Sequence, residues 1–349
     1  MKVTIQGREI GPGKPTYIIA EMSGNHKGDL QKALAIVGQA KAAGADAIKL
    51  QTYRADTITL DSQKPDFLIP ENDPWHYKGN LFALYEEAFT PWEWHAALFE
   101  EAKRVGIAIF SSPFDLTAVD FLETLGCPAY KIASPEITDI PLLRRVAQTR
   151  KPVIMSTGLA ELPDIALAVE TLKQNGCTEY ILLKCTASYP APPERMNLLT
   201  IPDMIRRFGC LAGLSDHTLG IGVPVASVAL GATVIEKHFM SDKDDQTVDS
   251  FFSLDPVTFK QMVDEVRKVE LALGGVVYDV FGDPGTKFKA RRSLYISTPI
   301  KAGEPLTASH VKSVRPSWGL HPKHYDAVLG RVVNRDLDKG DRLNLEDLT

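Results

Sequence analysis

The stretch that decides the fold runs over residues 214–240 and reads LSDHTLGIGVPVASVALGATVIEKHFM. A short apolar strand ends in His217, a helix rich in Val and Ala follows over Val223–Leu230, and a second strand ends in His238. Two strands joined through a helix predict a βαβ unit with parallel strands. Both histidines are then expected at the carboxyl ends of neighbouring strands, where parallel α/β proteins place their functional groups.

The same alternation of apolar strand and amphipathic helix extends over most of the chain. Besides the strand that begins at Val234, strands are expected at Tyr17–Ala20, Ala47–Leu50, Ile107–Phe110, Ala129–Ile132, Val153–Met155, Tyr180–Leu183 and Leu211–Leu214. Each is followed by a helix, and eight such units predict closure into a (β/α)8 TIM barrel, an α/β fold. A doubly wound open sheet is the alternative, but no glycine-rich phosphate loop follows the first strand.

The ends of the chain differ from the barrel in pattern. Residues 1–16 are expected to form an N-terminal hairpin, and the TIM-barrel catalytic domain spans 1–280, with a linker at 274–290. Residues 291–349 carry short β-prone runs and turns, which predicts a small β-rich domain. Residues 53–89 form a long insertion that is expected to cover one side of the functional site, and Thr90 is expected to cap the helix that follows it.

Composition narrows the classes of function. The chain has 349 residues, 44% of them apolar, and a formal net charge of −5. This charge and the lack of a long basic run argue against nucleic acid as a partner. No apolar run of about 18 residues occurs, so no membrane span is expected. Four cysteines without metal or disulfide spacing, and a start without a secretory signal, indicate a reduced, cytoplasmic protein.

Polar residues gather where the expected strands end. They include Glu21, Gln51, Lys49, Ser112, Lys131, Ser134, Ser156, Lys184, Ser215, Glu236 and the two histidines. Burying three lysines at one barrel mouth is costly unless an anion compensates them. Lysines with several hydroxyl donors therefore predict a site for a small, multiply charged anion, such as one with a phosphate and a carboxylate. A single lysine or serine at a strand end would more often be a solvated loop residue.

The two histidines are interpreted as metal ligands, although each could instead be a satisfied core residue. Two imidazoles with an oxygen ligand and open positions suit Mn²⁺, with Mg²⁺ or Co²⁺ as alternatives, acting as a Lewis acid. Glu21 and Glu236 are acid/base candidates, and either could instead neutralise a lysine.

At these residues the chain resembles the sialic acid synthase family, whose members condense phosphoenolpyruvate with sugars to make nonulosonic acids. The resemblance lies in Ile19-Ala20-Glu21, Ala45-Asp46-Ala47-Ile48-Lys49, Tyr130-Lys131-Ile132, Ser156-Thr157-Gly158, Leu214-Ser215-Asp216-His217 and Glu236-Lys237-His238-Phe239. The C-terminal residues resemble the antifreeze-like (SAF) domain that follows the barrel in this family. Segments such as Thr90-Pro91-Trp92-Glu93-Trp94-His95 make the chain most similar to the pseudaminic acid synthases.

The resemblance implies a role for each candidate residue. Phosphoenolpyruvate would be held by Lys49, Ser112, Lys131, Ser134, Ser156 and Ser215, with Lys184 added from its place at a strand end. The sugar would contact Glu21, Gln51, Tyr189 and Asp249, and the metal would be held by His217 and His238. Arg315 matches an arginine that the partner subunit inserts over the barrel, which implies a domain-swapped homodimer.

Departures from the N-acetylneuraminate synthases bear on the substrate. Ala187 stands in place of a phosphate-contacting Asn, and Ser112 replaces a Thr. The segment Thr247-Val248-Asp249-Ser250 replaces Gly-Pro-Asp-His, which favours a 6-deoxy sugar. We therefore expect a pseudaminic acid synthase with Glu21 managing the proton at the sugar aldehyde. The alternatives are the same chemistry on the N-acetylneuraminate or legionaminic acid precursor, or a non-catalytic carbohydrate-binding protein.

Overall fold

The computed structural model describes residues 2–278 and 284–349, which fall into two compact units, Met1–Gly274 and Gly275–Thr349. Within these residues no helix is both long and apolar enough to cross a membrane.

The first unit is a closed barrel of eight parallel strands, which confirms the predicted fold. The strands are β3 (Tyr17–Glu21), β4 (Ala47–Thr52), β5 (Ala108–Pro113), β6 (Tyr130–Ile132), β7 (Val153–Ser156), β8 (Tyr180–Cys185), β9 (Leu211–Asp216) and β10 (Val234–His238). They pair in chain order, and β10 closes the barrel against β3. The sequence could predict this closure because eight short apolar runs alternate with helices along the chain.

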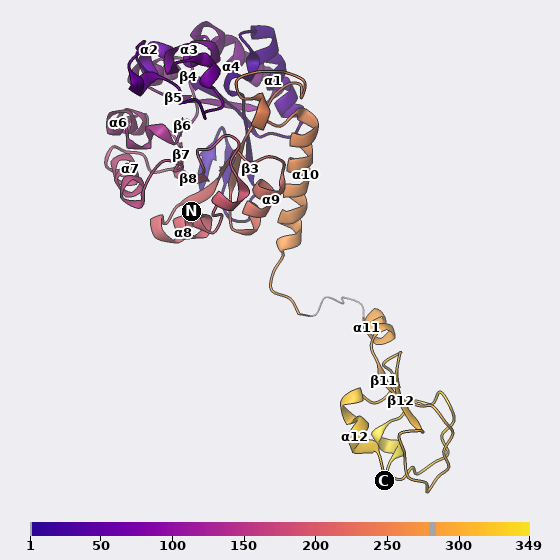
Figure 1. The fold of residues 1–349 in the computed structure, drawn as a ribbon. Helices are drawn as coiled ribbons and strands as arrows, with labels where there is room; N and C mark the ends of the chain where they lie inside the picture. Colours follow the sequence, from indigo (N-terminus) through magenta and orange to yellow (C-terminus); the bar gives the residue numbers. More distant parts are fainter. Residues whose placement is uncertain (1, 279–283) are drawn as a thin grey trace. The chain divides into compact units, whose positions relative to one another are not determined.

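Helices surround the strands (Figure 1). The connecting helices are α1 (Leu30–Ala42), α4 (His95–Val105), α5 (Leu116–Thr124), α6 (Ile140–Gln148), α7 (Leu162–Gln174), α8 (Thr200–Phe208), α9 (Gly222–Ala229) and α10 (Pro256–Leu273). Thr90 does not cap the helix after the insertion. A 3-10 turn at Trp92–Trp94 comes first, and the Thr90 hydroxyl lies 3.2 Å from Nε2 of His26 instead.

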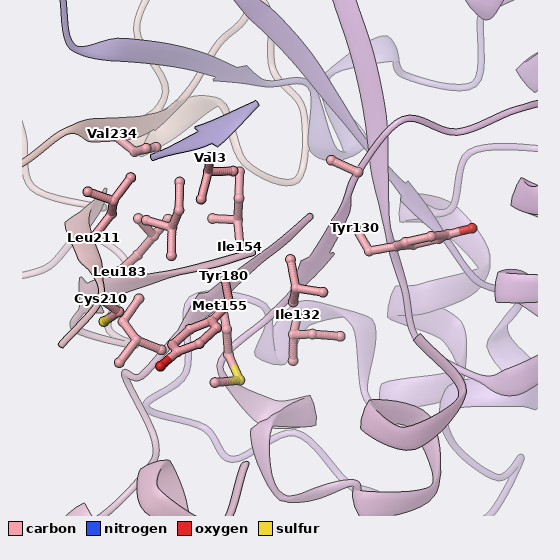
Figure 2. Packing of buried hydrophobic residues seen from close by; sticks show 14 of the residues in the cluster. Val3, Tyr130, Ile132, Ile154, Met155, Tyr180, Leu183, Cys210, Leu211 and Val234 are labelled. Atoms are coloured by element: carbon pink, nitrogen blue, oxygen red, sulfur yellow. The ribbon is translucent and has the colours of Figure 1, made fainter. Parts of the chain in front are cut away.

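The N-terminal hairpin closes the amino-terminal end of the barrel. Its strands β1 (Val3–Ile5) and β2 (Arg8–Ile10) are antiparallel, and their apolar side chains are buried. Figure 2 shows Val3 in one cluster with Ile154, Leu183 and Val234 of the barrel strands. The barrel interior at this end is therefore filled with apolar side chains.

The insertion lies against the mouth of the barrel. It contains α2 (Ala55–Ile58) and α3 (Leu81–Ala88), and its Ile69 and Leu84 pack with Val248 from the loop after β10. The indole Nε1 of Trp75 donates to the Val248 carbonyl at 2.7 Å. These contacts fix the insertion against the last barrel loop.

The second unit is a small β-rich domain with its own apolar core. Strands β11 (Ser293–Ile296) and β12 (Val311–Val314) are antiparallel, and the helix α12 (Tyr325–Val328) packs onto them through Val328. The core is built from Leu294, Ile296, Ile300, Leu306, Val311, Val328, Val333, Leu337, Leu343 and Leu348. Part of the expected linker is helical, as α11 (Pro284–Ala290), and residues 279–283 lie outside the described residues.

Candidate active site at the barrel mouth

Strand register brings one set of side chains into the barrel interior. Glu21 pairs with Lys49 across β3 and β4, Ser215 pairs with Glu236 across β9 and β10, and His238 pairs with Glu21. Side chains alternate between the two faces of a strand, and neighbours in register share a face. These residues therefore point into one interior space near the carboxyl ends of the strands.

Two lysines and two glutamates form the centre of this space. The Lys49 ammonium pairs with the Glu21 carboxylate and lies 3.8 Å from Oε1 of Glu236 and 3.2 Å from the Ser112 hydroxyl. Lys131 Nζ lies 3.2 Å from the same Glu236 oxygen. All four charged side chains are buried. Two cations and two carboxylates thus balance before any substrate is bound.

The environment separates the acidities of the two glutamates. Burial raises the pKa of Glu21, even though the Lys49 ammonium opposes this. Burial acts on Glu236 in the same direction, but Lys131 and Lys49 outweigh it and lower the pKa of that carboxyl. Glu21 is therefore the carboxyl of this pair that more readily takes up a proton, whereas Glu236 remains the counter-ion of the lysines.

Hydroxyl groups line the same space. The Ser215 hydroxyl donates to Glu236 at 3.2 Å, and the Ser134 hydroxyl accepts from the Gly158 backbone N–H at 3.0 Å. The buried Ser156 hydroxyl has no hydrogen-bond partner in the described ranges. A Cβ on Gly158 would lie 2.9 Å from Ser134 Oγ, so only glycine leaves space beside this hydroxyl. An unpaired buried hydroxyl beside lysines is suited to an anion.

The two histidines face one another at the mouth. Their ring centroids are 5.3 Å apart, and both residues are buried. Nδ1 of His217 lies 3.1 Å from the Thr186 carbonyl, which can only accept, so Nδ1 carries a proton and Nε2 is the nitrogen left to bind a metal. Burial, together with His217 and Lys49, holds the pKa of His238 well below its usual value, and its Nδ1 has no partner among described residues.

These histidines fit a metal with open coordination positions. Within residues 2–278 and 284–349, no group of three or more His, Cys, Asp and Glu side chains is arranged to hold an ion. In their neutral forms the two imidazoles can still supply one nitrogen ligand each, and substrate or water would complete the coordination.

A cavity of about 450 Å³ opens above the charged cluster. One side is polar and is formed by Ser23, Gln51, Glu136, His238 and Asp249, whereas the insertion and nearby loops provide an apolar side that includes Ile58, Ile69, Trp75, Leu81, Leu84, Tyr85 and Val248. The insertion thus covers the site, as its length predicted.

The polar side of the cavity is a connected network. Gln51 Nε2 donates to Glu21 at 3.0 Å and to the Ser23 hydroxyl at 3.1 Å, and Ser23 in turn bonds Asp249. Tyr189 packs on His217 with ring centroids 4.4 Å apart, and on Trp75 at 5.4 Å. Of the residues expected to contact a sugar, Gln51, Tyr189 and Asp249 line the cavity, and Glu21 is bonded to Gln51.

Two predicted residues are not part of this arrangement. Lys184 pairs with Leu214 on the opposite face of the strand, and its ammonium donates to the Cys185 carbonyl at 2.6 Å, so the structure does not bring it to the cluster. The interior position beside it belongs to Cys185, which pairs with Ser215. Arg315 is exposed on the second unit.

The structure adds Glu136, which the sequence analysis missed. It lies in the 3-10 turn Pro135–Thr138 after β6 and lines the cavity. One carboxylate oxygen is buried and has no partner among the described residues, and burial raises the pKa to about 7. The sequence feature that could have identified Glu136 is its position two residues after Ser134, beyond the end of the strand that carries Lys131.

Comparisons with known proteins agree with this geometry. Residues 36–278 match the NeuB family, and residues 291–349 match the SAF domain. Pseudaminic acid synthase from Campylobacter jejuni (strain 81-176) is 47% identical over 96% of this chain and 97% of its own length. Pseudaminic acid synthase from Helicobacter pylori is 42% identical over 96% of this chain and 98% of its own.

Solved structures point the same way. The spore coat polysaccharide biosynthesis protein spsE of Bacillus subtilis is similar over 100% of this chain and 99% of its own, with a TM-score of 0.69 and 32% identity. The N-acetylneuraminic acid synthetase of Leptospira borgpetersenii has a TM-score of 0.73 and 30% identity, and covers 81% of this chain and 93% of its own.

The fold and the site together define a (β/α)8-barrel enzyme whose polar groups lie at the carboxyl ends of its strands. More narrowly, this chain belongs to the NeuB family, whose members condense phosphoenolpyruvate with a sugar, and it carries a C-terminal SAF domain.

Proposed function

We propose that this chain is a pseudaminic acid synthase. It condenses phosphoenolpyruvate with 2,4-diacetamido-2,4,6-trideoxy-L-altrose and water, and releases pseudaminic acid and phosphate. The observation that carries this proposal is the 47% identity to the Campylobacter jejuni enzyme over nearly the full length of both chains. The buried lysines and unpaired hydroxyl of the barrel support it independently.

Phosphoenolpyruvate binds among the interior cations and hydroxyls. We assign its phosphate and carboxylate to Lys49, Lys131, Ser112, Ser134, Ser156 and Ser215. The ammonium groups are already fixed by carboxylates, so they need little reorganisation when they bind the phosphate and carboxylate of phosphoenolpyruvate. Lys184 has no place in this proposal because its ammonium lies on the other face of its strand.

The sugar occupies the cavity above. Gln51, Tyr189 and Asp249 line this space. We assign Arg315 of the partner subunit to complete it. The apolar wall from the insertion supports a sugar whose distal end carries methyl groups. A hydroxyl in place of the C6 hydrogen would be buried against this wall without a hydrogen bond, which costs about 1–3 kcal/mol.

A divalent metal, most suitably Mn²⁺, is assigned to His217 and His238. When bound, it would polarise the sugar aldehyde as a Lewis acid. Thr186 fixes the His217 ring through its Nδ1 proton, and the packing of Tyr189 holds the same ring in place. The hydrogen-bonded residues Ser215, Glu236 and Lys131 keep the anionic substrate oriented toward the aldehyde.

Two carboxyls are available for proton transfer. C3 of phosphoenolpyruvate attacks the aldehyde carbon, the aldehyde oxygen takes up a proton, water adds at C2, and phosphate then leaves. We assign the proton at the aldehyde oxygen to Glu21, whose raised pKa favours carrying one. Glu136 also lines the cavity and, with a pKa of about 7, is suited to taking a proton from the attacking water.

We further propose a domain-swapped homodimer in which Arg315 acts in the partner's barrel. Mixing an Arg315→Ala protein with a Lys131→Met protein tests this. In hybrid dimers one barrel then has an intact Lys131 and receives an intact Arg315, so activity should return. Two inactive proteins that stay inactive after unfolding and refolding together would contradict the swap.

A cytoplasmic location is consistent with four buried cysteines, none in a disulfide. The substrate proposal is tested by supplying phosphoenolpyruvate, Mn²⁺ and one of three sugars, and measuring phosphate release. The trideoxy-altrose derivative should give the highest kcat/KM. A higher kcat/KM with N-acetylmannosamine or the legionaminic acid precursor would show that the product is not pseudaminic acid. No phosphate release with any of the three sugars would favour a non-catalytic carbohydrate-binding protein.

A further inference from the structure

The ladder between β9 and β10 stops short of the two histidines. Its last pair joins Asp216 to Lys237. His217 follows Asp216 as the first residue beyond β9, and His238 pairs with Glu21 of β3 on its other side. Backbone pairing between these two strands therefore does not itself fix the separation of the imidazoles.

A buried ion pair lies at this last rung. The Lys237 ammonium is 2.6 Å from Oδ2 of Asp216, and both side chains are 0% exposed. Residues next to each other on a strand point to opposite faces, so this pair lies behind the strands and the imidazoles lie in front. Neither charged group is among the residues that line the cavity.

The same ammonium holds both ends of the segment that carries His217. Besides Asp216, Lys237 Nζ donates to the Thr218 carbonyl. Asp216 accepts from the Thr218 backbone N–H at 3.2 Å and from its hydroxyl at 3.0 Å. The three residues thus form a tight turn with His217 at its centre, and Lys237 ties this turn to the strand that carries His238.

We propose that the Asp216–Lys237 ion pair is a positioning device that fixes His217 against His238 at the separation a divalent metal requires. The pair touches neither metal nor substrate and acts through the two imidazoles. This inference rests on the metal site of the proposed function. A fully buried ion pair adds little stability compared with an apolar pair of similar size, so its position beside the two histidines favours a role in geometry.

Two variants separate positioning from stability. Lys237→Met leaves the Asp216 carboxylate buried and unpaired, so the melting temperature and the metal affinity should both fall. Asp216→Asn/Lys237→Met removes the unpaired charge, so the melting temperature should recover in large part. The double variant still lacks the Lys237 ammonium that joins the His217 turn to β10, so its Mn²⁺ affinity should remain about 10- to 100-fold weaker than that of the unaltered protein.

The readouts are free Mn²⁺ by electron paramagnetic resonance, phosphoenolpyruvate affinity by calorimetry without metal, and thermal melting. The phosphoenolpyruvate affinity of the double variant should change by less than about threefold, because its site does not contact the pair. Asp46→Asn is the matched control. It breaks the ion pair of Asp46 with Arg8 and Arg267 and should lower the melting temperature without weakening Mn²⁺ binding.

A double variant that regains full Mn²⁺ affinity along with its melting temperature would overturn the inference and leave the proposed function intact. If the unaltered protein binds no Mn²⁺, the inference and the metal assignment fail together. Weak Mn²⁺ binding in a thermally recovered double variant, with phosphoenolpyruvate binding unchanged, supports it.

Discussion

Lys131 and Glu236 meet across the inside of the barrel, with Nζ 3.2 Å from Oε1, although they come from strands β6 and β10, which are not neighbours. Both side chains are buried, and Glu236 also lies 3.8 Å from Lys49. The lysines are therefore held in place by carboxylates before an anion arrives. This arrangement holds the ammonium groups in place without the cost of an unpaired buried cation.

Lys131 and Lys184 both lie at strand ends, but only the Lys131 ammonium lies in the interior cluster, so replacing each lysine tests whether the cluster binds phosphoenolpyruvate. Lys131→Met is expected to weaken phosphoenolpyruvate binding by roughly 100-fold, because a hydrogen bond to a buried charged group contributes about 1.5–3 kcal/mol. Lys184→Met is the matched control and should leave the affinity nearly unchanged, since its ammonium faces away from the cluster. Calorimetric titration with phosphoenolpyruvate measures both. Equal losses in the two variants would contradict the assignment.

Glu21→Gln should abolish turnover and spare binding. The variant keeps the hydrogen-bonding shape of the carboxyl but cannot exchange a proton, so kcat should fall by at least about 100-fold. Phosphoenolpyruvate affinity should stay within a few fold, because Glu236 still neutralises Lys49. Single-turnover phosphate release and calorimetry check the two halves, and retained turnover would end the proton assignment.

Glu136 should give the protein a measurable pH dependence of stability. Its folded pKa of about 7 lies above the ordinary value of 4.5, so the folded state binds more protons than the unfolded state between these pH values. The free energy of unfolding should therefore fall as pH rises through this window, by up to about 3 kcal/mol from this group. Glu136→Gln should remove that part of the fall in urea titrations at pH 5 and pH 8. A variant with the same pH slope as the original would refute the raised pKa.

Trp75 should matter for the sugar and not for phosphoenolpyruvate. Its indole ring packs on Tyr189 and Phe251, and its N–H holds the Val248 carbonyl, so Trp75→Ala removes part of the apolar wall. We expect the KM for the sugar to rise about tenfold or more, with that for phosphoenolpyruvate unchanged. Tyr77→Ala, an exposed residue of the same insertion, serves as the control. A parallel rise in both KM values would indicate general disruption instead.

The sequence predicted the barrel because strand and helix alternate with few exceptions, and it predicted Lys49, Lys131 and the histidines as one group. It could not decide which face Lys184 occupies. A shift of one residue at a strand end reverses the direction of a side chain, and only the pairing of Cys185 with Ser215 sets that register.

Two other differences, at Glu136 and Thr90, have separate causes. Glu136 points into the cavity because the 3-10 turn after β6 redirects the chain, and no periodic pattern marks such a turn. Thr90 has the residue type of a helix cap, but its hydroxyl lies within hydrogen-bonding distance of the buried His26. For Thr90, a partner distant in sequence overrode the local preference for capping.

The most direct test of the central claim is a crystal structure with phosphoenolpyruvate and Mn²⁺, with the metal located by its anomalous scattering. The account predicts a single strong peak shared by the imidazoles of His217 and His238, with the phosphate and carboxylate of the ligand contacting Lys49 and Lys131. Metal bound away from the two imidazoles, or the ligand bound away from the two lysines, would contradict it.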